Sequence, residues 1–306
     1  MSPAGWPSTL YTAPPHWQWL IVGYFFVGGL AGGSYFLAVL IDLFGAPEDR
    51  PLARLGYYIS FPAVLLSGLL LTLDLHRPDR FWHMLVQSRT WRPMFKSYSP
   101  MSVGSWALLL FGLFAFVAFL SALHDAGRVR WAWLRRVRPP GVVGSLVAIV
   151  GGIVGFFIAG YTGVLLAVTN RPIWADTPLL GLNFVISAAS TSAALLILLA
   201  WRCRQSGGVL ALERFDTAVL AIELVALVAL LASLGSMLRA WLSAWGLLLL
   251  VGVILVGIVL PLLLEWRWRP ARPGWRPAVT ALLVLVGGFI FRMVVILSAE
   301  GIGRPL

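Results

Sequence analysis

The stretch from Gly246 to Leu264, GLLLLVGVILVGIVLPLLL, decides the fold class of this chain. Its nineteen residues contain no charged side chain and do not alternate between apolar and polar positions. A transmembrane helix needs about 20 apolar residues to cross the bilayer core, whereas the strands of a membrane barrel alternate and are about ten residues long. The stretch therefore predicts a membrane-spanning α-helix.

Seven further stretches are long and predominantly apolar, and the connectors between them are short, the longest being 76-101. No connector is long enough to form a soluble domain, so we expect one integral membrane domain over residues 1-306. The predicted fold class is an all-α polytopic membrane protein whose eight transmembrane helices form two four-helix bundles. The helices are expected near 17-43, 55-75, 102-123, 142-168, 179-200, 216-238, 242-264 and 278-298.

Composition agrees with this prediction, because hydrophobic residues make up 59% of the chain and charged residues only 11%. The net charge of +11 comes from basic residues at the membrane edges, so it indicates topology rather than a nucleic-acid partner. Fourteen Lys and Arg lie in the connectors on one side of the predicted membrane and eight on the other. The positive-inside rule then places both termini on the extracytoplasmic side of the cell inner (cytoplasmic) membrane.

The residues that commonly hold metals are few and badly placed for that purpose. Cys203 is the only cysteine, so the protein cannot ligate an iron–sulfur cluster by itself. A membrane haem b generally needs two histidines facing each other within helices, but His16, His76, His83 and His124 fall at helix ends or in connectors. We therefore expect no intrinsic haem, no metal site and no complete active site in this chain alone.

Small residues recur at a spacing of four within two predicted helices. Gly28, Gly29, Gly32 and Gly33 give two such steps in the first helix, and Gly151 with Gly155 gives another in the fourth. Such faces let helix backbones approach closely in lipid. They indicate either tight helix contacts or room for a flat ligand beside the backbone.

Three ionisable side chains share one level within the predicted helices. At a rise of 1.5 Å per residue, Tyr24, Tyr161 and Arg292 lie roughly 10 Å below the extracytoplasmic surface. Ionisable groups at such depth are costly and mark a binding site or pathway, a structural ion pair, or an interfacial anchor. A second group, Asp42, Asp216 and Glu223, lies deeper and indicates either a proton path that includes Arg292 or a structural pairing with a cytoplasmic arginine.

Four stretches of this sequence resemble the signatures of the NrfD/PsrC membrane subunits, which anchor polysulfide reductase-like and related molybdenum or cytochrome complexes. The most specific is Ser-Pro-Met-Ser-Val-Gly-Ser-Trp, residues 99-106. The others are 74-82 (DLHRPDRFW), 160-174 (GYTGVLLAVTNRPIW) and 287-292 (GGFIFR). The resemblance covers essentially the whole chain.

The resemblance implies a haem-free, quinone-reactive subunit that docks an iron–sulfur protein on its outer face. Electrons would pass between that subunit and a menaquinone or ubiquinone held among the first four helices, in a complex with a molybdopterin or multihaem catalytic subunit. The match to the helix-four tyrosine makes Tyr161 the first choice for a hydrogen bond to a quinone carbonyl. Asp74 and His76 are candidate proton relays, and Tyr24, His16 and Asn170 are further candidates for the quinone site.

Five basic residues run against the positive-inside trend, and all belong to the connector 76-101. An acidic or polar partner surface would account for them, while the alternative is a solvated connector near lipid headgroups. The docking candidates are Arg77, Arg80, Arg89, Arg92 and Lys96.

Two other functions stay open at this point. The protein could be a proton- or ion-conducting, transporter-like subunit without quinone chemistry, whose buried Asp, Glu and Arg side chains form the path. It could also be a simple anchor that holds redox partners at the membrane.

Overall fold

A computed structural model describes residues 17–75, 77–169, 171–205, 207–268 and 274–301 of the protein. Within these residues the regular structure is helical, without a strand, and the one β-bridge joins Val86 to Pro93. Eight helical segments are long and apolar enough to cross a membrane. The predicted all-α, eight-span, multi-pass membrane fold is therefore confirmed.

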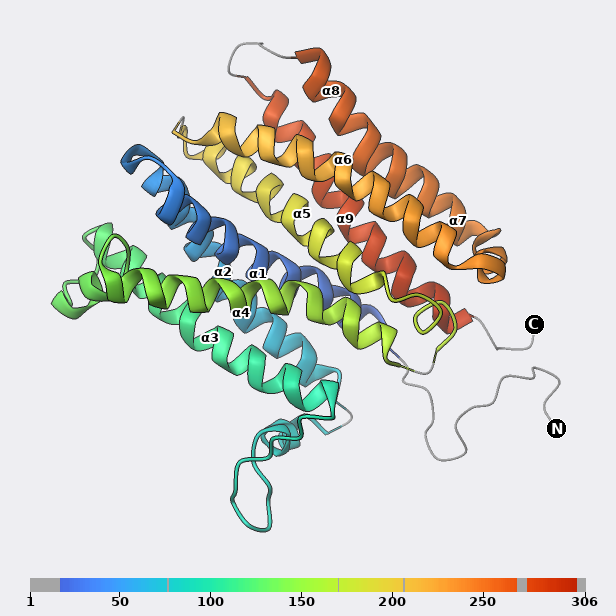
Figure 1. Cartoon of the computed structure of the whole chain (residues 1–306), viewed down its shortest axis with the longest axis horizontal. Coiled ribbons are helices and arrows are strands. Elements are labelled where there is room, and N and C mark those ends of the chain that lie inside the picture. The colour runs from blue at the N-terminus through green and yellow to red at the C-terminus, as the bar shows by residue number, and fades with distance from the viewer. Residues whose placement is uncertain (1–16, 76, 170, 206, 269–273, 302–306) are drawn as a thin grey trace.

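Figure 1 shows the eight spans lying side by side along one direction. The seventh span is built from three consecutive pieces, α7 (Ala244–Leu248), a π-helical stretch (Leu249–Val259) and α8 (Leu260–Trp268). Short 3-10 helices cover Pro47–Asp49, Pro78–Met84, Ala132–Val137 and Gly235–Trp241. The other spans are α1 (Trp19–Phe44), α2 (Arg50–Leu73), α3 (Pro100–Asp125), α4 (Val142–Ala167), α5 (Leu180–Arg202), α6 (Val209–Ser233) and α9 (Arg276–Gly301).

The largest boundary error concerns α6, which was expected at 216-238 but runs from Val209 to Ser233. Hydropathy marks the part of a helix that lies in hydrocarbon, whereas the helix itself continues through Glu213 and Arg214. At its other end the helix stops before Gly235, whose φ of 52° lies in the left-handed region. The following apolar residues therefore form a 3-10 turn and not the last turns of α6.

The small-residue face of α1 is a tight helix contact. A Cβ atom added at Gly32 would lie 2.3 Å from the carbonyl oxygen of Gly155 on α4. One added at Gly33 would lie 2.3 Å from the hydroxyl of Ser192 on α5. Close backbone approach is the main way in which helices associate in lipid, so these glycines hold α1 against two neighbours at once.

A second close approach joins the seventh span to α9. A Cβ atom added at Gly287 would lie 2.3 Å from the Cα atom of Gly257 in the π-helical stretch. Nearby, Ile290 of α9 fills the space in front of Gly252. Both contacts belong to the half of the molecule that contains α5 to α9.

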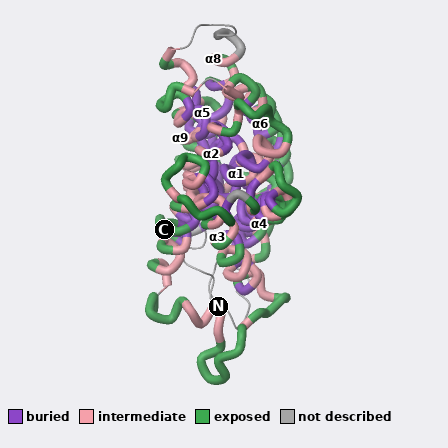
Figure 2. The backbone as a smooth tube through the Cα atoms, turned by 90° about the vertical axis from the view of Figure 1, so that its left-hand side faces the viewer, coloured by how far each residue is buried: buried purple, intermediate pink, exposed green. Residues whose placement is uncertain are grey.

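Residue burial follows this arrangement. Figure 2 shows the buried residues concentrated in the middle of the molecule and the exposed ones at its periphery. Within the apolar 18-residue central part of each span, α1 is buried over the largest share of residues and α3 over the smallest. Because α1 contacts α5 and α9 as well as α2 and α4, the two sets of four helices share an extensive boundary. Their division into two bundles stays a prediction.

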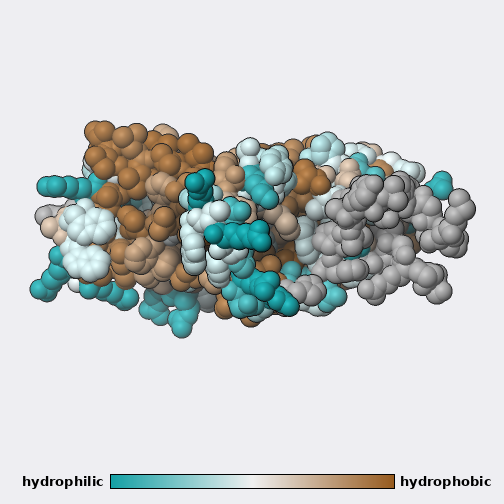
Figure 3. Space-filling model, turned by 90° about the horizontal axis from the view of Figure 1, so that it is seen from below, coloured by the Kyte–Doolittle hydropathy of each residue, from teal (hydrophilic) through white to brown (hydrophobic). Residues whose placement is uncertain are grey.

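The surface of the spans is apolar, as a lipid environment requires. Large hydrophobic side chains such as Leu69, Leu113, Val225 and Leu250 are exposed on the helices. Figure 3 shows this apolar surface as a broad brown area, with hydrophilic side chains gathered near the middle of the same face.

The start of α1 and the end of α9 lie at the same end of the molecule, as expected for an even number of spans (Figure 1). We call this the terminal end, and the other the opposite end. The long connector between α2 and α3 also belongs to the terminal end, where it projects from the helices. This end carries the site described next.

Candidate functional site

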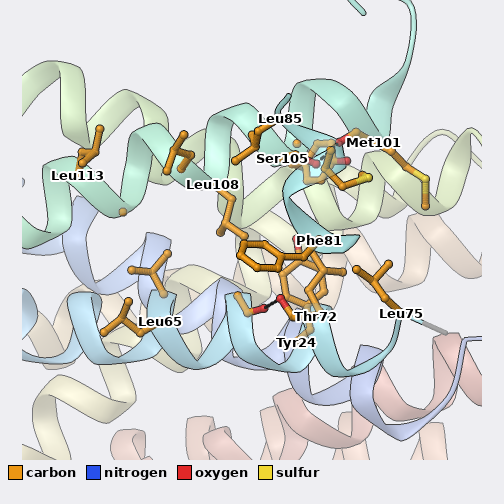
Figure 4. A pocket seen from close by; sticks show the side chains of 18 of the residues that line it. Tyr24, Leu65, Thr72, Leu75, Phe81, Leu85, Met101, Ser105, Leu108 and Leu113 are labelled. Carbon is orange, nitrogen blue, oxygen red and sulfur yellow. Dashed lines mark hydrogen bonds between the residues drawn. The ribbon is translucent and has the colours of Figure 1, made fainter. Parts of the chain in front are cut away.

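A cavity of about 710 Å³ lies between α2 and α3, toward the terminal end. Helix α1 contributes Tyr24 to its inner wall, α4 contributes Tyr161 and Leu165, and the connector covers it with Phe81 and neighbouring residues. Figure 4 shows the side chains of α2 and α3 on opposite sides of this space. A volume of this size is in the range of ligand pockets.

The cavity opens toward lipid. Several residues that line it are also exposed on the membrane-spanning surface, including Leu65 on α2 with Leu109, Leu113 and Phe116 on α3. An apolar molecule dissolved in the bilayer can therefore enter between α2 and α3 without crossing water.

Four hydroxyl groups belong to the lining, and three of them are committed to backbone carbonyls. Thr72 donates to Gly68 at 2.7 Å, Ser105 donates to Met101 at 2.8 Å, and Tyr161 donates to Pro100 at 2.7 Å. Within the described residues the hydroxyl of Tyr24 makes no hydrogen bond, although this side chain is only 3% exposed. A buried donor that lacks a protein partner is available to a ligand.

Gly104 determines where the ring of Tyr161 lies. A Cβ atom at this position would lie 2.1 Å from both the hydroxyl oxygen and the Cζ atom of Tyr161. The ring therefore crosses α3 directly over Gly104, and its hydroxyl reaches the carbonyl of Pro100 in the first turn of that helix. This contact joins α4 to the start of α3.

The Ser-Pro-Met-Ser-Val-Gly-Ser-Trp stretch also ties the connector to α3. The side chain of Ser99 caps the helix by accepting from the backbone N–H of Ser102. Trp106 and Ser102 both donate to the carbonyl of Met94, at 2.9 and 3.4 Å. The backbone N–H of Lys96 donates to the Ser102 hydroxyl at 3.0 Å, so the end of the connector is fixed over the cavity.

The connector itself is ordered by local contacts. Trp82 and Trp91 stack with their ring centroids 5.5 Å apart, and the Val86–Pro93 bridge closes the turn that contains Trp91. The five predicted docking cations are all exposed on this segment, together with the aromatic side chains of Trp91, Phe95 and Tyr98. These cations are Arg77, Arg80, Arg89, Arg92 and Lys96.

The structure brings together some of the candidates for the quinone site. Tyr24 and Tyr161 both line the cavity. Asp74 is not among its lining residues but follows α2 directly, between the lining residues Thr72 and Leu75. The remaining candidates, His16, His76 and Asn170, lie outside the described residues.

Sequence reasoning did not identify several residues that shape the cavity. Gly68, Thr72, Phe81 and Gly112 line it, and the hydrophobic periodicity of a membrane helix does not distinguish such positions from lipid-facing ones. The available signal for these positions was the presence of Gly68 and Gly112 within aliphatic stretches of their helices.

Asp42 is part of a structural ion-pair cluster at the opposite end. The Nε and Nη2 atoms of Arg138 each donate to its carboxylate at 3.0 Å, and the Tyr57 hydroxyl donates at 3.0 Å. Arg138 also pairs with Asp125. Burial lowers the pKa of Arg138, but its hydrogen bonds to Asp42 and the nearby negative charges outweigh burial and raise this pKa above its usual value. The structural pairing considered for Asp42 is thus the arrangement that forms.

Glu223 and Arg292 are buried in the core instead, and each forms a hydrogen bond with a serine of α5. Ser190 donates to the Glu223 carboxylate at 2.7 Å, and Arg292 donates to the Ser187 hydroxyl at 3.1 Å and to the carbonyl of Gly288 at 2.8 Å. Arg292 is fully buried, yet its Nε and Nη2 atoms make no hydrogen bond in the described part of the chain. One carboxylate oxygen of the buried Asp216 is likewise unpaired there.

Comparison with known proteins adds independent findings. Residues 9–301 match the family model described as "Polysulphide reductase, NrfD". The sequence is 27% identical to "Protein NrfD" of Escherichia coli over 317 aligned residues, which cover 93% of this chain and 95% of that protein. It is 29% identical to one of the chains of the polysulfide reductase of Wolinella succinogenes, over 57% of this chain and 55% of that relative. A shorter match, 27% identical over 34% of this chain and 22% of the relative, is to one of the subunits of the selenate reductase of Mesobacillus selenatarsenatis.

The Asp42 cluster yields a stability prediction. Replacing Arg138 with Gln leaves a buried carboxylate without its cation, so we expect a loss of about 3–5 kcal/mol and a lower midpoint of thermal unfolding in detergent. Arg136→Gln, at an exposed position, is the control. The double variant Asp42→Asn/Arg138→Gln should recover part of the loss. Equal midpoints for Arg138→Gln and Arg136→Gln would contradict a stabilising role for the ion pair.

Proposed function

Because the chain belongs to the NrfD polysulphide reductase family, we propose that it is the quinone-reactive membrane anchor of a respiratory oxidoreductase complex. The observation that carries the proposal is the lipid-open cavity between α2 and α3, with the uncommitted hydroxyl of Tyr24 in its wall. A quinone is an apolar molecule with two carbonyl oxygens, so it needs an apolar cleft and a small number of hydrogen bonds. The cavity offers both. In this proposal the quinone is a menaquinone or ubiquinone that exchanges with the bilayer.

The two tyrosines suit different forms of this substrate. Reduction of a quinone to a quinol takes two electrons and two protons, and each carbonyl oxygen becomes a hydroxyl. Tyr24 can donate a hydrogen bond to a quinone carbonyl. Tyr161 already donates to Pro100, so its oxygen is better placed to accept a hydrogen bond from a quinol hydroxyl. Asp74 lies at the end of α2, beside the cavity. Of the two candidate proton relays, it is the one that belongs to the described residues, and we assign it the exchange of protons with water.

Electrons must reach or leave this site through another protein, since we assign no haem or iron–sulfur cluster to the chain. We propose that an iron–sulfur subunit docks on the terminal end, over the connector with its five exposed cations. Two of the relatives are named as parts of a polysulfide reductase and a selenate reductase, which supports a place in a larger complex. Its catalytic subunit would carry a molybdopterin or several haems. In this arrangement the terminal end faces outward from the inner membrane.

A second candidate function is proton conduction through the half of the molecule that contains α5, α6 and α9. Buried atoms of Arg292 and Asp216 that lack a partner among the described residues favour it, and Glu223 is buried in the same half. Unsatisfied ionisable groups within a membrane commonly mark internal water or a proton relay. This role is compatible with quinone chemistry, because movement of protons can be coupled to it.

Tyr24→Phe tests the quinone site. Loss of one hydrogen bond, worth about 0.5–1.5 kcal/mol, should weaken the apparent affinity of the purified complex for a quinone analogue about three- to tenfold. Tyr58→Phe is the control, because this tyrosine donates to Ala122 near the opposite end. If both variants show the wild-type KM and inhibitor affinity, Tyr24 does not contact the quinone.

Neutralising the connector tests partner docking. In the triple variant Arg89→Gln, Arg92→Gln and Lys96→Gln, we expect less iron–sulfur subunit to co-purify with this protein, because the electrostatic complementarity is lost. The loss should grow as salt is added, since salt screens the remaining cations. The matched control neutralises three exposed arginines of the connector between α3 and α4, namely Arg128, Arg130 and Arg136. Equal recovery of the partner with both triple variants would place the docking surface elsewhere.

Glu223→Gln tests the proton path. In a complex reconstituted into vesicles, we expect the number of protons translocated per quinone to fall while quinone turnover stays within about twofold, because the carboxylate is remote from the cavity. Glu48→Gln, in the exposed turn before α2, is the control. Unchanged proton translocation by Glu223→Gln would end this second function.

A further inference from the structure

The cavity is elongated along the helices. On α2 its lining extends from Phe61 to Leu75, and on α3 from Met101 to Phe116. At 1.5 Å per residue each wall is roughly 20 Å long. This length far exceeds the width of a single aromatic ring. In Figure 4 the ring of Phe81 covers only one part of the cavity.

Polarity divides the cavity into two parts. The hydroxyls of Tyr24, Thr72, Ser105 and Tyr161 all belong to the half nearer the terminal end. The other half contains aliphatic and aromatic side chains, including Leu65 and Leu113 (Figure 4), and ends at Phe61 and Phe116. A molecule that fills the whole space must therefore have a small polar head and a long apolar extension.

Two glycines keep the space open. At Gly68 on α2 and at Gly112 on α3 an added Cβ atom would meet no atom within 4 Å. Most glycines of the spans differ from these: Gly32, Gly33 and Gly104, for example, are required by close contacts within the protein. Helix packing therefore does not account for Gly68 and Gly112, which both line the cavity.

We infer that the groove between α2 and α3 binds the isoprenoid tail of a polyprenyl quinone, and that Gly68 and Gly112 are specificity-determining residues for that tail. The inference rests on the proposed quinone function and adds the orientation of the substrate. The ring lies at the hydroxyl end beside Tyr24, whose buried donor faces the cavity. The tail runs along α2 and α3 toward the middle of the bilayer and leaves past Leu65 and Leu113.

The chemistry of the lining argues against a phospholipid in this groove. A phospholipid headgroup carries a phosphate, which proteins bind with Arg, Lys or clustered N–H groups. Among its described residues the lining contains no charged side chain, and three of its four hydroxyls already donate to carbonyls. A neutral head that needs one donor fits these groups better.

Adding bulk to the groove tests the inference in the purified complex. We would measure turnover of Gly112→Leu and Gly68→Leu with two quinols, one that bears an isoprenoid tail of several units and one that has the same ring without a tail. We would also extract and quantify the quinone that co-purifies. We expect the catalytic efficiency for the tailed quinol, and the quinone content, to fall at least about tenfold, because a side chain now occupies the space of the tail. Efficiency with the tailless quinol should stay within about twofold of wild type.

Two sets of variants control for side effects of bulk. Leu69→Phe and Leu110→Phe enlarge exposed side chains of the same helices outside the cavity, and both should behave as wild type. Gly112→Ala adds a single methyl group and favours the helix, so it should retain the fold and give an intermediate effect. Thermal unfolding of every variant checks that the helices still assemble.

The outcomes separate this inference from the proposed function. If both quinols lose activity equally in stable Gly→Leu variants, or neither loses any, the groove does not select the tail, although the quinone site stands. If wild-type complex neither retains quinone nor turns over either quinol, the proposed function itself fails. Co-purified phospholipid that disappears in Gly112→Leu while quinone content is unchanged would show a lipid-filled groove and overturn the inference.

Discussion

Close backbone approach along one face of α1 is the constraint on which the rest of the structure depends. In lipid no hydrophobic effect drives one apolar helix against another, so association relies on packing and on polar contacts between helices. Gly32 and Gly33 allow α1 to meet α4 and α5 at distances that a side chain would forbid. Gly29, on the same face, lies beside the buried guanidinium of Arg292 on α9. Helix α1 thereby becomes the common neighbour of both halves of the molecule.

The central position of α1 leaves α2 and α3 at the edge, where they contact fewer helices. Helix α3 packs against its neighbours through the buried Phe111 and Ala115 in its middle, and it is also held at the terminal end. At the terminal end Tyr161 lies over Gly104 and donates to Pro100, while Trp106 and Ser102 hold the connector through the carbonyl of Met94. Toward the terminal end α2 and α3 leave the lipid-open cavity between them. One of these contacts commits the Tyr161 hydroxyl, while Thr72 and Ser105 donate to carbonyls of their own helices. Among the described hydroxyls of the lining, Tyr24 is left available to a ligand.

The sequence was a good guide wherever a single helix was concerned. Eight apolar stretches predicted eight spans, because the thickness of the hydrocarbon core requires such stretches whatever the packing. The boundaries of α6 were wrong because helix and hydrocarbon do not end at the same residue. Tyr161 and Tyr24 do line one cavity, but depth could not reveal that the Tyr161 hydroxyl already donates to Pro100. Asp42 looked equivalent to Glu223 in sequence, yet its carboxylate pairs with Arg138, ninety-six residues away.

What the sequence determined by itself is the environment of the protein, the number of its spans and, through the Ser-Pro-Met-Ser-Val-Gly-Ser-Trp stretch, the resemblance to its family. These follow from local properties: hydropathy, length and a contiguous motif. Only the tertiary structure decided which glycines touch another backbone and which border an empty space, since Gly32 and Gly112 are both small residues within apolar helices. It also decided which buried hydroxyls remain available as donors. Both depend on distances between helices, and in a membrane those distances are set by contacts among residues far apart in the sequence.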